Sequence, residues 1–586
     1  MKINIENNIK GIFMVLFCIS IFLFAHSNGY NILPFDSNII LYLYSMVGSI
    51  AFLYLLKPCI RLKAIDIACL IYFIYNILWL LMTSKVKNME ALYLFIFLAM
   101  LYVNMRNIFP TYYKYIIYSF PFIVISHFVY YICWGNPYYF LYEHKGVFSG
   151  FFYNSGLWGE FVAVALICNI GLIYLNKKNK KIFALLVLPA FIISFILYES
   201  DSRASWLSFT IGVLIFFLPF IIKYLRKLII IRISSLLILS CLCAYLISGL
   251  YSYKKDSADG RILIWQISLE MVKDKPIWGY GFDGFRKNYM NYQATYLQEK
   301  QVLEVISNIA DDNHYAFNEF LRIIIEYGII GAILSFCFLT AIGYTIYKHK
   351  LYVDIVSRTM VSCLVALLFF SFFSYPLSAF HINVLIVILL AGLACFSQNT
   401  LIRKLQIKPI ILIIPYSIIF SVSLVYLFTY SEKNSDWLNI MKGVYANDNI
   451  FEEARKKLSG NPYFLFTYGK YLNRKNDYSK ASLILSQSMK EHPSYYTMIE
   501  LGISYKAQNR YTEALYCFEK ARNMVPHKIK PLYLMMKLYY DNNNYELAMQ
   551  LSNEILCKQP KIRTAELNII LKKTILLQEK MNARLH

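Results

Sequence analysis

The sequence predicts an all-α chain in two parts, a polytopic membrane domain over residues 1–430 and a helical solenoid over residues 431–586. Hydrophobic residues make up 58% of the 586 residues, only 16% are charged, and the mean hydropathy is +0.47. Soluble domains are about 45–50% apolar and about 25% charged, so this chain has more apolar surface than a water-soluble fold would bury. Thirteen apolar stretches predict the first part, and a repeat of 33 or 34 residues predicts the second.

The thirteen stretches are long and apolar enough to be interpreted as transmembrane helices. The first has no small-residue cleavage site, so we interpret it as an anchor rather than a removed signal peptide. A buried core helix is the alternative for any one stretch, but thirteen in series argue against it for the set. Their approximate limits are 11–25, 38–56, 66–82, 90–104, 115–133, 156–175, 182–198, 204–222, 228–250, 320–346, 358–374, 380–396 and 409–428.

The connections between these stretches alternate in charge. His26–Ser37 and Ser374–Phe380, which each join an odd-numbered stretch to an even-numbered one, hold no Lys or Arg. The even-to-odd connections are basic, so the positive-inside rule predicts that they and the N-terminus are cytoplasmic. Because the number of spans is odd, the tail is then predicted to be periplasmic. The short connection Ser84–Glu90 runs against this pattern. The basic residues are Lys57, Arg61, Lys63, Arg106, Lys114, Lys177, Lys178, Lys180, Lys181, Lys223, Arg226, Lys227, Lys348, Lys350, Arg358, Arg403, Lys404 and Lys408.

The tail contains an aromatic residue, a small residue and a closing proline at a constant period, which is the signature of tetratricopeptide repeats. The small residue lets the two helices of a hairpin approach, and the proline ends the second helix. Such solenoids offer a concave surface to a partner. The repeated segments are Tyr478–Ala481, Tyr511–Ala514 and Tyr545–Ala548, with Pro493, Pro526 and Pro560, and a divergent unit begins near Phe451.

Cysteine usage and metal-ligand patterns exclude several classes of site. Twelve cysteines follow no ordered spacing, which excludes a disulfide framework and a zinc ribbon. We expect Cys517 and Cys557 to pack rather than to pair. No His-Glu-x-x-His motif and no cysteine pair with ligand spacing occurs, so we predict no metal and no cofactor.

A polar turn lies between the predicted helices 182–198 and 204–222, with the sequence Glu199-Ser-Asp-Ser-Arg203-Ala-Ser-Trp206. An arginine on the outer side is unusual, because basic residues gather in the connections predicted to be cytoplasmic. We therefore expect Arg203 to have an anionic partner. The alternative is an arginine whose side chain reaches to the lipid headgroups. Carboxylates of this turn, together with Asp311 and Asp312, are the alternative ligands for a divalent cation.

The long loop, residues 251–319, is the largest insertion among the predicted spans. Gly279-Tyr-Gly-Phe-Asp-Gly284 matches a nucleotide fingerprint, but no βαβ unit surrounds it, so we do not interpret it as a nucleotide site. Eight basic and nine acidic residues over 251–318 do not make a nucleic-acid surface, and we predict no nucleic-acid partner. The loop also contains Arg261, Arg286 and His314.

Three arginines and a histidine are thus expected at one membrane face. Arginine suits bidentate recognition of a pyrophosphate, and a polyprenyl pyrophosphate–sugar is an anionic substrate presented at that depth. Transferring the sugar to an acceptor hydroxyl needs a base near that hydroxyl and positive charge on the departing pyrophosphate. His314 is the candidate base, and a structural histidine is the alternative.

At these residues the chain resembles the O-antigen ligase / O-antigen polymerase superfamily, over roughly residues 140–346. The family's second histidine is replaced here by phenylalanine. A periplasmic tetratricopeptide tail is similar to that of several ligases and of the related protein O-oligosaccharyltransferases. The three patterns that carry the resemblance are Arg203 with Leu207; Gly260-Arg261, Trp265 and Pro276–Gly281; and His314-Tyr-Ala-Phe317-Asn318 with Gly328.

The resemblance implies a bacterial inner-membrane glycosyltransferase of GT-C-like fold. It would move a preassembled glycan from undecaprenyl pyrophosphate to an acceptor hydroxyl on the periplasmic side, with inversion and without nucleotide sugar or metal. A ligase acting on lipid A core is the first expectation. The alternatives are a protein O-oligosaccharyltransferase, a polysaccharide polymerase, and, among non-enzymes, a lipid-glycan transporter or an anchored scaffold.

The residue roles follow from these patterns. The expected partners are the undecaprenyl-pyrophosphate glycan, an acceptor that is lipid A core, protein or glycan, membrane lipids, and a protein partner at the tetratricopeptide tail. The tail has 24 basic and 14 acidic residues from Lys433 onwards, which favours an anionic partner there, with a solvated basic surface as the alternative. The predicted catalytic residues are His314, Arg203 and Arg261, and the predicted substrate-binding residues are Arg286, Asn318, Trp265 and Asp201.

Overall fold

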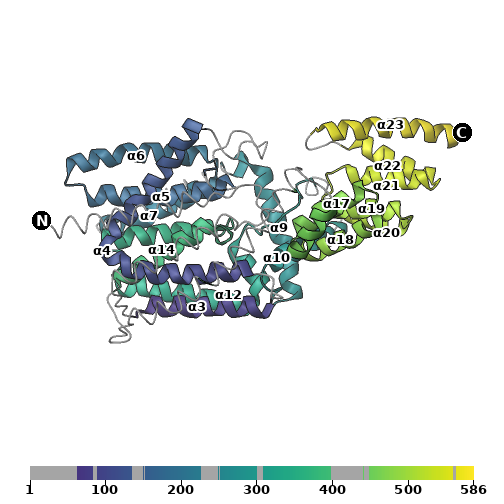
Figure 1. The fold of residues 1–586 in the computed structure, drawn as a ribbon. Coiled ribbons are helices and arrows are strands. Elements are labelled where there is room, and N and C mark those ends of the chain that lie inside the picture. Colours follow the sequence, from purple (N-terminus) through teal and green to yellow (C-terminus); the bar gives the residue numbers. More distant parts are fainter. Residues whose placement is uncertain are drawn as a thin grey trace. The chain divides into compact units, whose positions relative to one another are not determined.

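The protein is all-helical wherever its structure is described (Figure 1). The computed structural model describes residues 62–83, 89–134, 149–225 apart from 151 and 153, 249, 251–299, 308–397, 421, 440, 448–558 and 563–585. The all-α class is confirmed. The chain divides into two compact units. Unit 1 is residues 1–250, 317–323 and 329–438, and unit 2 is residues 251–316, 324–328 and 439–586.

Unit 1 consists of long apolar helices. Six of the described helical segments are long and apolar enough to cross a membrane, and three shorter apolar ones accompany them. Four of the thirteen predicted spans (11–25, 38–56, 228–250 and 409–428) lie outside the described residues, apart from the single residues 249 and 421, so the number thirteen stays a prediction. The helices are α3 (Ala64–Thr83), α4 (Met89–Trp134), α5 (Ser155–Leu175), α6 (Lys180–Glu199), α7 (Arg203–Leu225), α12 (Glu319–Lys348), α13 (Ile355–Phe370), η1 (Pro376–Ser378) and α14 (Phe380–Phe396).

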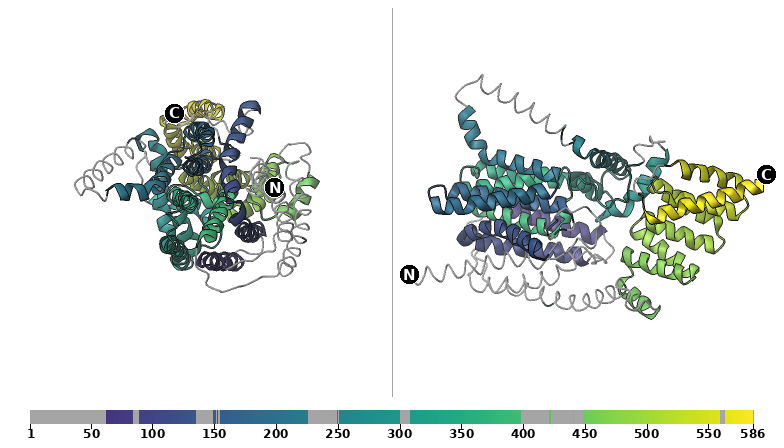
Figure 2. Two further views of the ribbon diagram at one scale, coloured as in Figure 1. Left: turned by 90° about the vertical axis from the view of Figure 1, so that its left-hand side faces the viewer. Right: turned by 90° about the horizontal axis from the view of Figure 1, so that it is seen from above.

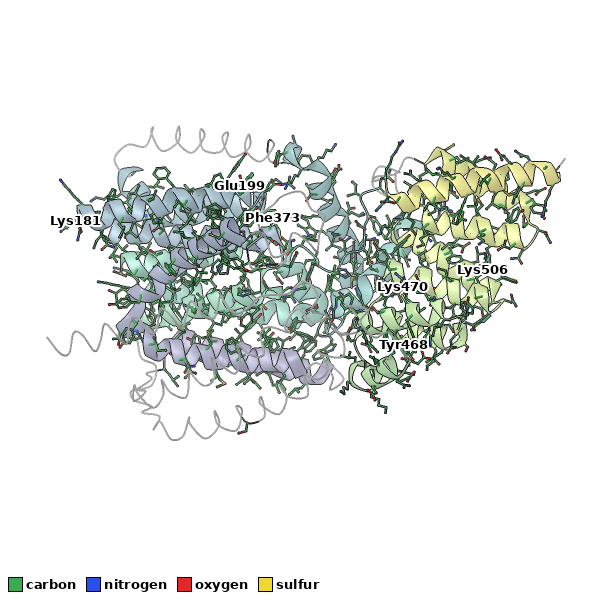
Figure 3. The ribbon with its side chains drawn as sticks, turned by 45° about the horizontal axis from the view of Figure 1, so that its top comes forward. Lys181, Glu199, Phe373, Tyr468, Lys470 and Lys506 are labelled. Carbon is green, nitrogen blue, oxygen red and sulfur yellow. The ribbon has the colours of Figure 1, made fainter. Side chains whose placement is uncertain are left out.

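Helix α5 is the most enclosed of the six long apolar segments. It is 83% buried over its apolar window, whereas α6 and α12 are each 17% buried. Small residues permit this packing, because a Cβ on Gly159 would lie 2.6 Å from Ser200 Oγ and one on Gly171 would lie 2.2 Å from Thr359 Oγ1. Helix α6 instead exposes large apolar side chains such as Leu185 and Phe191, as a lipid-facing helix does. Lys181 and Glu199 mark its two ends (Figure 3).

The predicted connection between residues 104 and 115 is wrong, because α4 continues through it. Figure 1 shows α4 bent along its length, and Pro110 and Pro121 lie inside it. Proline removes a helical hydrogen bond and bends a helix without ending it when neighbours support the backbone. Arg106 and Lys114 are therefore residues of a helix and not of a loop.

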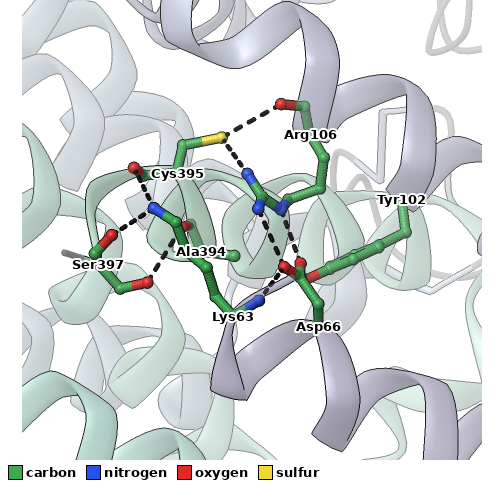
Figure 4. A network of polar contacts seen from close by, with 7 residues as sticks. All are labelled: Lys63, Asp66, Tyr102, Arg106, Ala394, Cys395 and Ser397. Carbon is green, nitrogen blue, oxygen red and sulfur yellow. Dashed lines mark hydrogen bonds and ion pairs between the residues drawn. The ribbon is translucent and has the colours of Figure 1, made fainter. Parts of the chain in front are cut away.

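A buried polar network holds α3, α4 and the end of α14 together (Figure 4). The Arg106 guanidinium donates to both Asp66 oxygens, from Nε at 2.6 Å and from Nη2 at 2.9 Å, and Tyr102 Oη donates to the same carboxylate. Lys63 Nζ donates to the carbonyl oxygens of Cys395 and Ser397. A bidentate, fully hydrogen-bonded pair of this kind tolerates burial that an isolated charge would not.

Unit 2 contains successive helical hairpins, which follow one another as a stack in Figure 2. The repeated tyrosines begin the second helix of three hairpins, at Tyr478, Tyr511 and Tyr545. The helices are α9 (Lys255–Asp274), α10 (Gly284–Glu299), α16 (Asp448–Leu458), α17 (Pro462–Arg474), α18 (Tyr478–Glu491), α19 (Tyr495–Ala507), α20 (Tyr511–Met524), α21 (Lys530–Asp541), α22 (Tyr545–Cys557) and α23 (Ala565–Leu585).

The turn inside each hairpin repeats with the sequence. Asn476, Asn509 and Asn543 take positive φ angles of 66°, 59° and 60°, a conformation that asparagine tolerates better than most residues. Each is hydrogen-bonded by the hydroxyl of the tyrosine two residues on, and each repeated alanine is fully buried. The tetratricopeptide-like architecture is thus confirmed. Cys517 is buried and Cys557 exposed, and both thiols are free. Pro560 lies outside the described residues.

The long loop is largely helical and belongs to the same unit as the repeats. Helix α10 packs against α20, and the fully buried Gln293 of α10 donates to the carbonyl oxygens of Met524 and Asp311. A second contact joins the repeats to the long loop, where His527 Nδ1 lies 3.0 Å from Ala310 O. The tail therefore supports the fold of the long loop in addition to any role in capturing a partner.

Candidate functional site

The predicted residues Asp201 and Arg203 lie in the turn from α6 to α7 of unit 1. Asp201 has a positive φ of 49°, which makes the turn tight enough for α7 to begin two residues later. Trp206 fixes the turn, since its indole Nε1 donates to Leu197 O at 2.9 Å and its ring stacks on Tyr198. Both candidate side chains are half-buried. The turn therefore holds an arginine and a carboxylate at the end of two apolar helices.

A buried glutamate lies close to this turn and was not among the predicted site residues. Glu160 of α5 is fully buried, and Ser208 Oγ of α7 donates to its Oε2. Within the described part of the chain, Glu160 Oε1 has no hydrogen-bond partner. An ionisable side chain within a membrane-spanning segment marks a candidate functional position. The signal in the sequence was the single acidic residue of the apolar stretch 156–175.

In unit 2, the glycines of the fingerprint-like segment bring two backbones together. Tyr280 N and Gly281 N donate to Ile325 O and Glu326 O at 2.8 and 2.9 Å, next to the non-helical Gly328 of α12. A Cβ on Gly328 would lie 2.0 Å from Ile277 O, and one on Gly279 would lie 2.5 Å from Ile325 O. Both glycines also have positive φ, at 65° and 66°. These glycines are required by close backbone approach, which agrees with the interpretation that no nucleotide binds there.

Trp265 and Asn318 have structural contacts of their own. Trp265 Nε1 of α9 donates to Ala316 O at 3.0 Å, which anchors the end of the segment that carries His314. Asn318 caps α12 in unit 1, where its side chain accepts from Leu321 N at 3.0 Å. Phe317, in the position of the family's second histidine, packs edge-on against Tyr375. Substrate binding by Trp265 and Asn318 stays a prediction beside these roles.

Arg286 and His314 lie within electrostatic range of each other in unit 2. Arg286 Nε and Nη2 both donate to Asp283 Oδ2, at 3.1 and 2.6 Å. Burial opposes the charge of Arg286, but Asp283 holds the pKa of the guanidinium above its ordinary value. Burial and Arg286 lower the pKa of His314 to about 4, with partial opposition from Asp283 and Asp311. His314 is therefore neutral at pH 7 and able to accept a proton.

A second histidine, which belongs to the repeats, contacts His314 and was not predicted as a site residue. The ring centroids of His314 and His492 are 4.7 Å apart. His492 is 3% exposed, and its Nδ1 lies 3.2 Å from Arg286 O. Burial, His314 and Arg286 lower its pKa to about 3. No local pattern in the sequence links His492 to a residue 178 positions earlier.

Two acidic residues near His314 in the sequence, Asp312 and Glu319, are alternative bases, and they lie in different environments. Burial raises the pKa of Asp312 to about 6, although Lys528 works against this shift. Glu319 in unit 1 is 2% exposed and is committed on both oxygens, since Oε2 accepts from Arg322 and Oε1 accepts from Leu377 N. Asp312 is therefore the better alternative to His314 as a base. Arg261 lies one turn before Trp265 on α9 and is half-buried.

The predicted residues thus divide between the two units. Arg203, Asp201 and Asn318 belong to unit 1, and Arg261, Trp265, Arg286 and His314 belong to unit 2. The structure brings Arg286 and His314 together and adds His492 to them. Among the residues that the structure describes, no group of three or more His, Cys, Asp or Glu is arranged to hold a metal ion.

Comparison with known proteins locates the family resemblance on the segment that contains these residues. Residues 188–336 match the family described as O-antigen ligase. The expected resemblance to that family is confirmed for this segment. The O-antigen ligase-like segment contains all seven predicted site residues, from Asp201 to Asn318.

Two curated relatives carry names of polysaccharide ligases. A protein of Rickettsia typhi (strain ATCC VR-144 / Wilmington) is 30% identical over 174 residues, which cover 28% of this chain and 40% of that protein. One of Rickettsia felis (strain ATCC VR-1525 / URRWXCal2) is 29% identical over 178 residues, which cover 29% and 41%. The chain thus spans about two fifths of the length of the curated relatives it matches.

A comparison of structures finds the crystal structure of yeast Tom70, at 12% identity and a TM-score of 0.23, over 83% of this chain and 96% of that chain. A score this low does not establish a shared fold, so the description of the repeats rests on their own helices and turns.

Proposed function

We propose that the protein is a membrane glycosyltransferase of the ligase type. It moves a preassembled glycan from undecaprenyl pyrophosphate to an acceptor hydroxyl, with lipid A core as the first candidate acceptor. The observation that carries this proposal is the O-antigen ligase match over residues 188–336, which includes the arginines, the histidine and the helices α9 and α10 of the long loop. The curated relatives with polysaccharide-ligase names support the same reaction class.

The reaction is a single displacement. The acceptor oxygen attacks the anomeric carbon, and the bond from that carbon to the pyrophosphate oxygen breaks, so that the electron pair leaves with undecaprenyl pyrophosphate. The acceptor's proton passes to His314, which is neutral and able to receive it. Arg203, Arg261 and Arg286 offset the charge that develops on the leaving pyrophosphate. Inversion at the anomeric carbon follows from one displacement.

The site is proposed to face the periplasm of a bacterial inner membrane, with the N-terminus in the cytoplasm. The buried network of Lys63, Arg106 and Ser397 supports this arrangement, because the charge pattern assigns Lys63, Arg106 and the basic segment that follows Ser397 in the sequence to the same side. Alkaline phosphatase, which is active only outside the cytoplasm, is expected to be active when fused after Glu432. An inactive fusion there, alongside an active one within the long loop, would overturn the predicted position of the tail.

Glycan analysis of a deletion strain tests the function. Loss of O-antigen from lipid A core, with unlinked glycan accumulating on undecaprenyl pyrophosphate, is the expected result. Loss of glycan from proteins would change the acceptor to protein, and shortened chains with attachment intact would indicate a polymerase. Unchanged glycans on all three acceptors would refute the proposal.

Arg203→Lys is expected to weaken transfer by about 1–3 kcal/mol of transition-state binding, because lysine keeps the charge and loses the two-pronged contact. The measurement is the transfer rate of purified protein at matched expression, with Lys223→Arg as the control at the other end of α7. Wild-type rates in Arg203→Lys would instead assign Arg203 to the lipid headgroups.

A further inference from the structure

His492 is held in one orientation by the repeat that carries it. It is the residue after α18, with extended backbone angles (φ −155°, ψ 96°) and Pro493 next in the chain. A residue before proline is restricted to extended conformations, so the turn between α18 and α19 is stiff at this point. The imidazole is 3% exposed and lies against the first turn of α10 and the segment around His314.

The tautomer of the His492 ring follows from the hydrogen bond that its Nδ1 makes. Arg286 O is a carbonyl and can only accept, so Nδ1 of His492 carries the proton and donates to it at 3.2 Å. In the neutral ring Nε2 then holds a lone pair. Within the described residues, that buried nitrogen has no hydrogen-bond partner.

His314 presents the complementary atom. Its Nδ1 is likewise buried, with no hydrogen-bond partner in the described part of the chain, and its ring centroid is 4.7 Å from that of His492. That separation allows a nitrogen of one ring to come within hydrogen-bond distance of a nitrogen of the other. Leaving two buried nitrogens of this kind without partners is unfavourable, which favours a hydrogen bond between them. A proton on His314 Nδ1 satisfies both at once.

We propose that His492 is a positioning residue for His314, supplied to the site by the tetratricopeptide-like repeats. His492 Nδ1–H donates to Arg286 O at 3.2 Å. His314 Nδ1 and His492 Nε2 are not hydrogen-bonded to each other in the structure, and a rotation of the His314 ring, which already contacts His492, lets His314 Nδ1–H donate to His492 Nε2. This chain of hydrogen bonds fixes the tautomer in which His314 Nε2 is the bare nitrogen, so Nε2 receives the acceptor's proton. The inference rests on the proposed function, because it concerns the base of the same reaction.

The facing charged and titratable groups are compatible with this role. From α10 and the turn before it come Arg286 and Asp283, from the segment after α10 comes Asp311, and from α17 comes Tyr463, whose pKa burial raises. The low pKa values of both histidines keep the pair neutral before the proton arrives. A proton that enters at His314 Nε2 is then stabilised by the acceptor nitrogen of His492.

The test compares two histidines that dock the long loop onto the repeats in the same way. His527 Nδ1 contacts Ala310 O as His492 Nδ1 contacts Arg286 O, and it is His492 whose ring lies against that of His314. With full-length protein and an undecaprenyl-pyrophosphate glycan, we expect His492→Ala to lower kcat about 10–100-fold with little change in KM, as loss of an orienting partner does for metal-bound histidines. His527→Ala should retain most of the wild-type kcat.

Two further variants separate positioning from folding. His492→Gln keeps an amide donor and a carbonyl acceptor in the place of the two ring nitrogens, so it should recover part of the lost kcat. In a His314→Ala background, His492→Ala should cause no further loss, because the two residues act as a unit.

Two results would overturn the positioning role. One is equal kcat losses in His492→Ala and His527→Ala, and the other is an undiminished effect of His492→Ala without His314. A wild-type protein with no transfer activity would instead refute the proposed function.

Discussion

A chain that ends after Ser435 is expected to lose glycan transfer altogether, not merely efficient use of the acceptor. The reason is that the long loop and the repeats form one compact unit. Without the repeats, α10 loses α20, Gln293 loses its bond to Met524 O, and the ring of His314 loses His492. Buried side chains of α10 such as Phe285 and Tyr289 belong to the same unit and depend on its integrity.

A shorter truncation provides the control for this prediction. Ending the chain after Lys558 removes α23, which packs on α21 and α22 and covers Ile555 and Ala548. It leaves α16–α22 and all described contacts with the long loop in place. Transfer should survive this change at a reduced thermal stability. Full transfer to the native acceptor by the Ser435 truncation would contradict the idea that the repeats complete the site.

His314→Ala is expected to lower turnover by about 10²–10⁴-fold, the range for removal of a general base, with a smaller effect on donor binding. The pH profile identifies the base. His314 must be unprotonated to act, and its pKa is lowered to about 4 by burial and Arg286. The wild-type rate should therefore fall as the pH drops through about 4 and should not change between pH 5 and 7 on that limb.

Asp312 gives a distinguishable outcome. Burial raises its pKa to about 6, so a rate that falls as the pH drops through about 6, and loses that limb in Asp312→Asn, would transfer the role of base to Asp312.

The stability of the folded protein also depends on the pH through the two histidines, His314 and His492. Both have folded-state pKa values below the ordinary value of about 6.5, so protonation favours the unfolded chain and stability falls as the pH drops from about 6.5 toward 4. Profiles should therefore be recorded with a check that the protein stays folded.

Much of the fold follows from patterns within the sequence. Apolar runs of spanning length predicted α3, α5, α6, α7 and α12, because a membrane helix needs little beyond length and hydropathy. The period of 33 or 34 residues predicted the hairpins that begin at Tyr478, Tyr511 and Tyr545. The break expected between residues 104 and 115 was wrong, because the charge of Arg106 is met by Asp66, about 40 residues earlier, inside the helical bundle.

The candidate site was harder to predict, because its contacts join distant parts of the chain. His314, Gly279 and Gly328 stood out through the family patterns, and Arg286 as one of the arginines expected at one membrane face. The contact of His314 with His492 depends on how the long loop folds against the repeats, and no periodicity records that. Glu160 is a single carboxylate within the apolar stretch 156–175, and one charged residue leaves the hydropathy pattern of such a stretch unchanged.

Direct transfer by purified full-length protein tests the central claim most directly. The protein is mixed with an undecaprenyl-pyrophosphate glycan of known anomeric configuration and with lipid A core, in buffer that contains EDTA. We predict that the glycan appears on the core with inverted configuration and that undecaprenyl pyrophosphate is released in equal amount. Retention of configuration, a requirement for added divalent cation, or no transfer to lipid A core, protein or glycan acceptors by the folded protein would contradict the account.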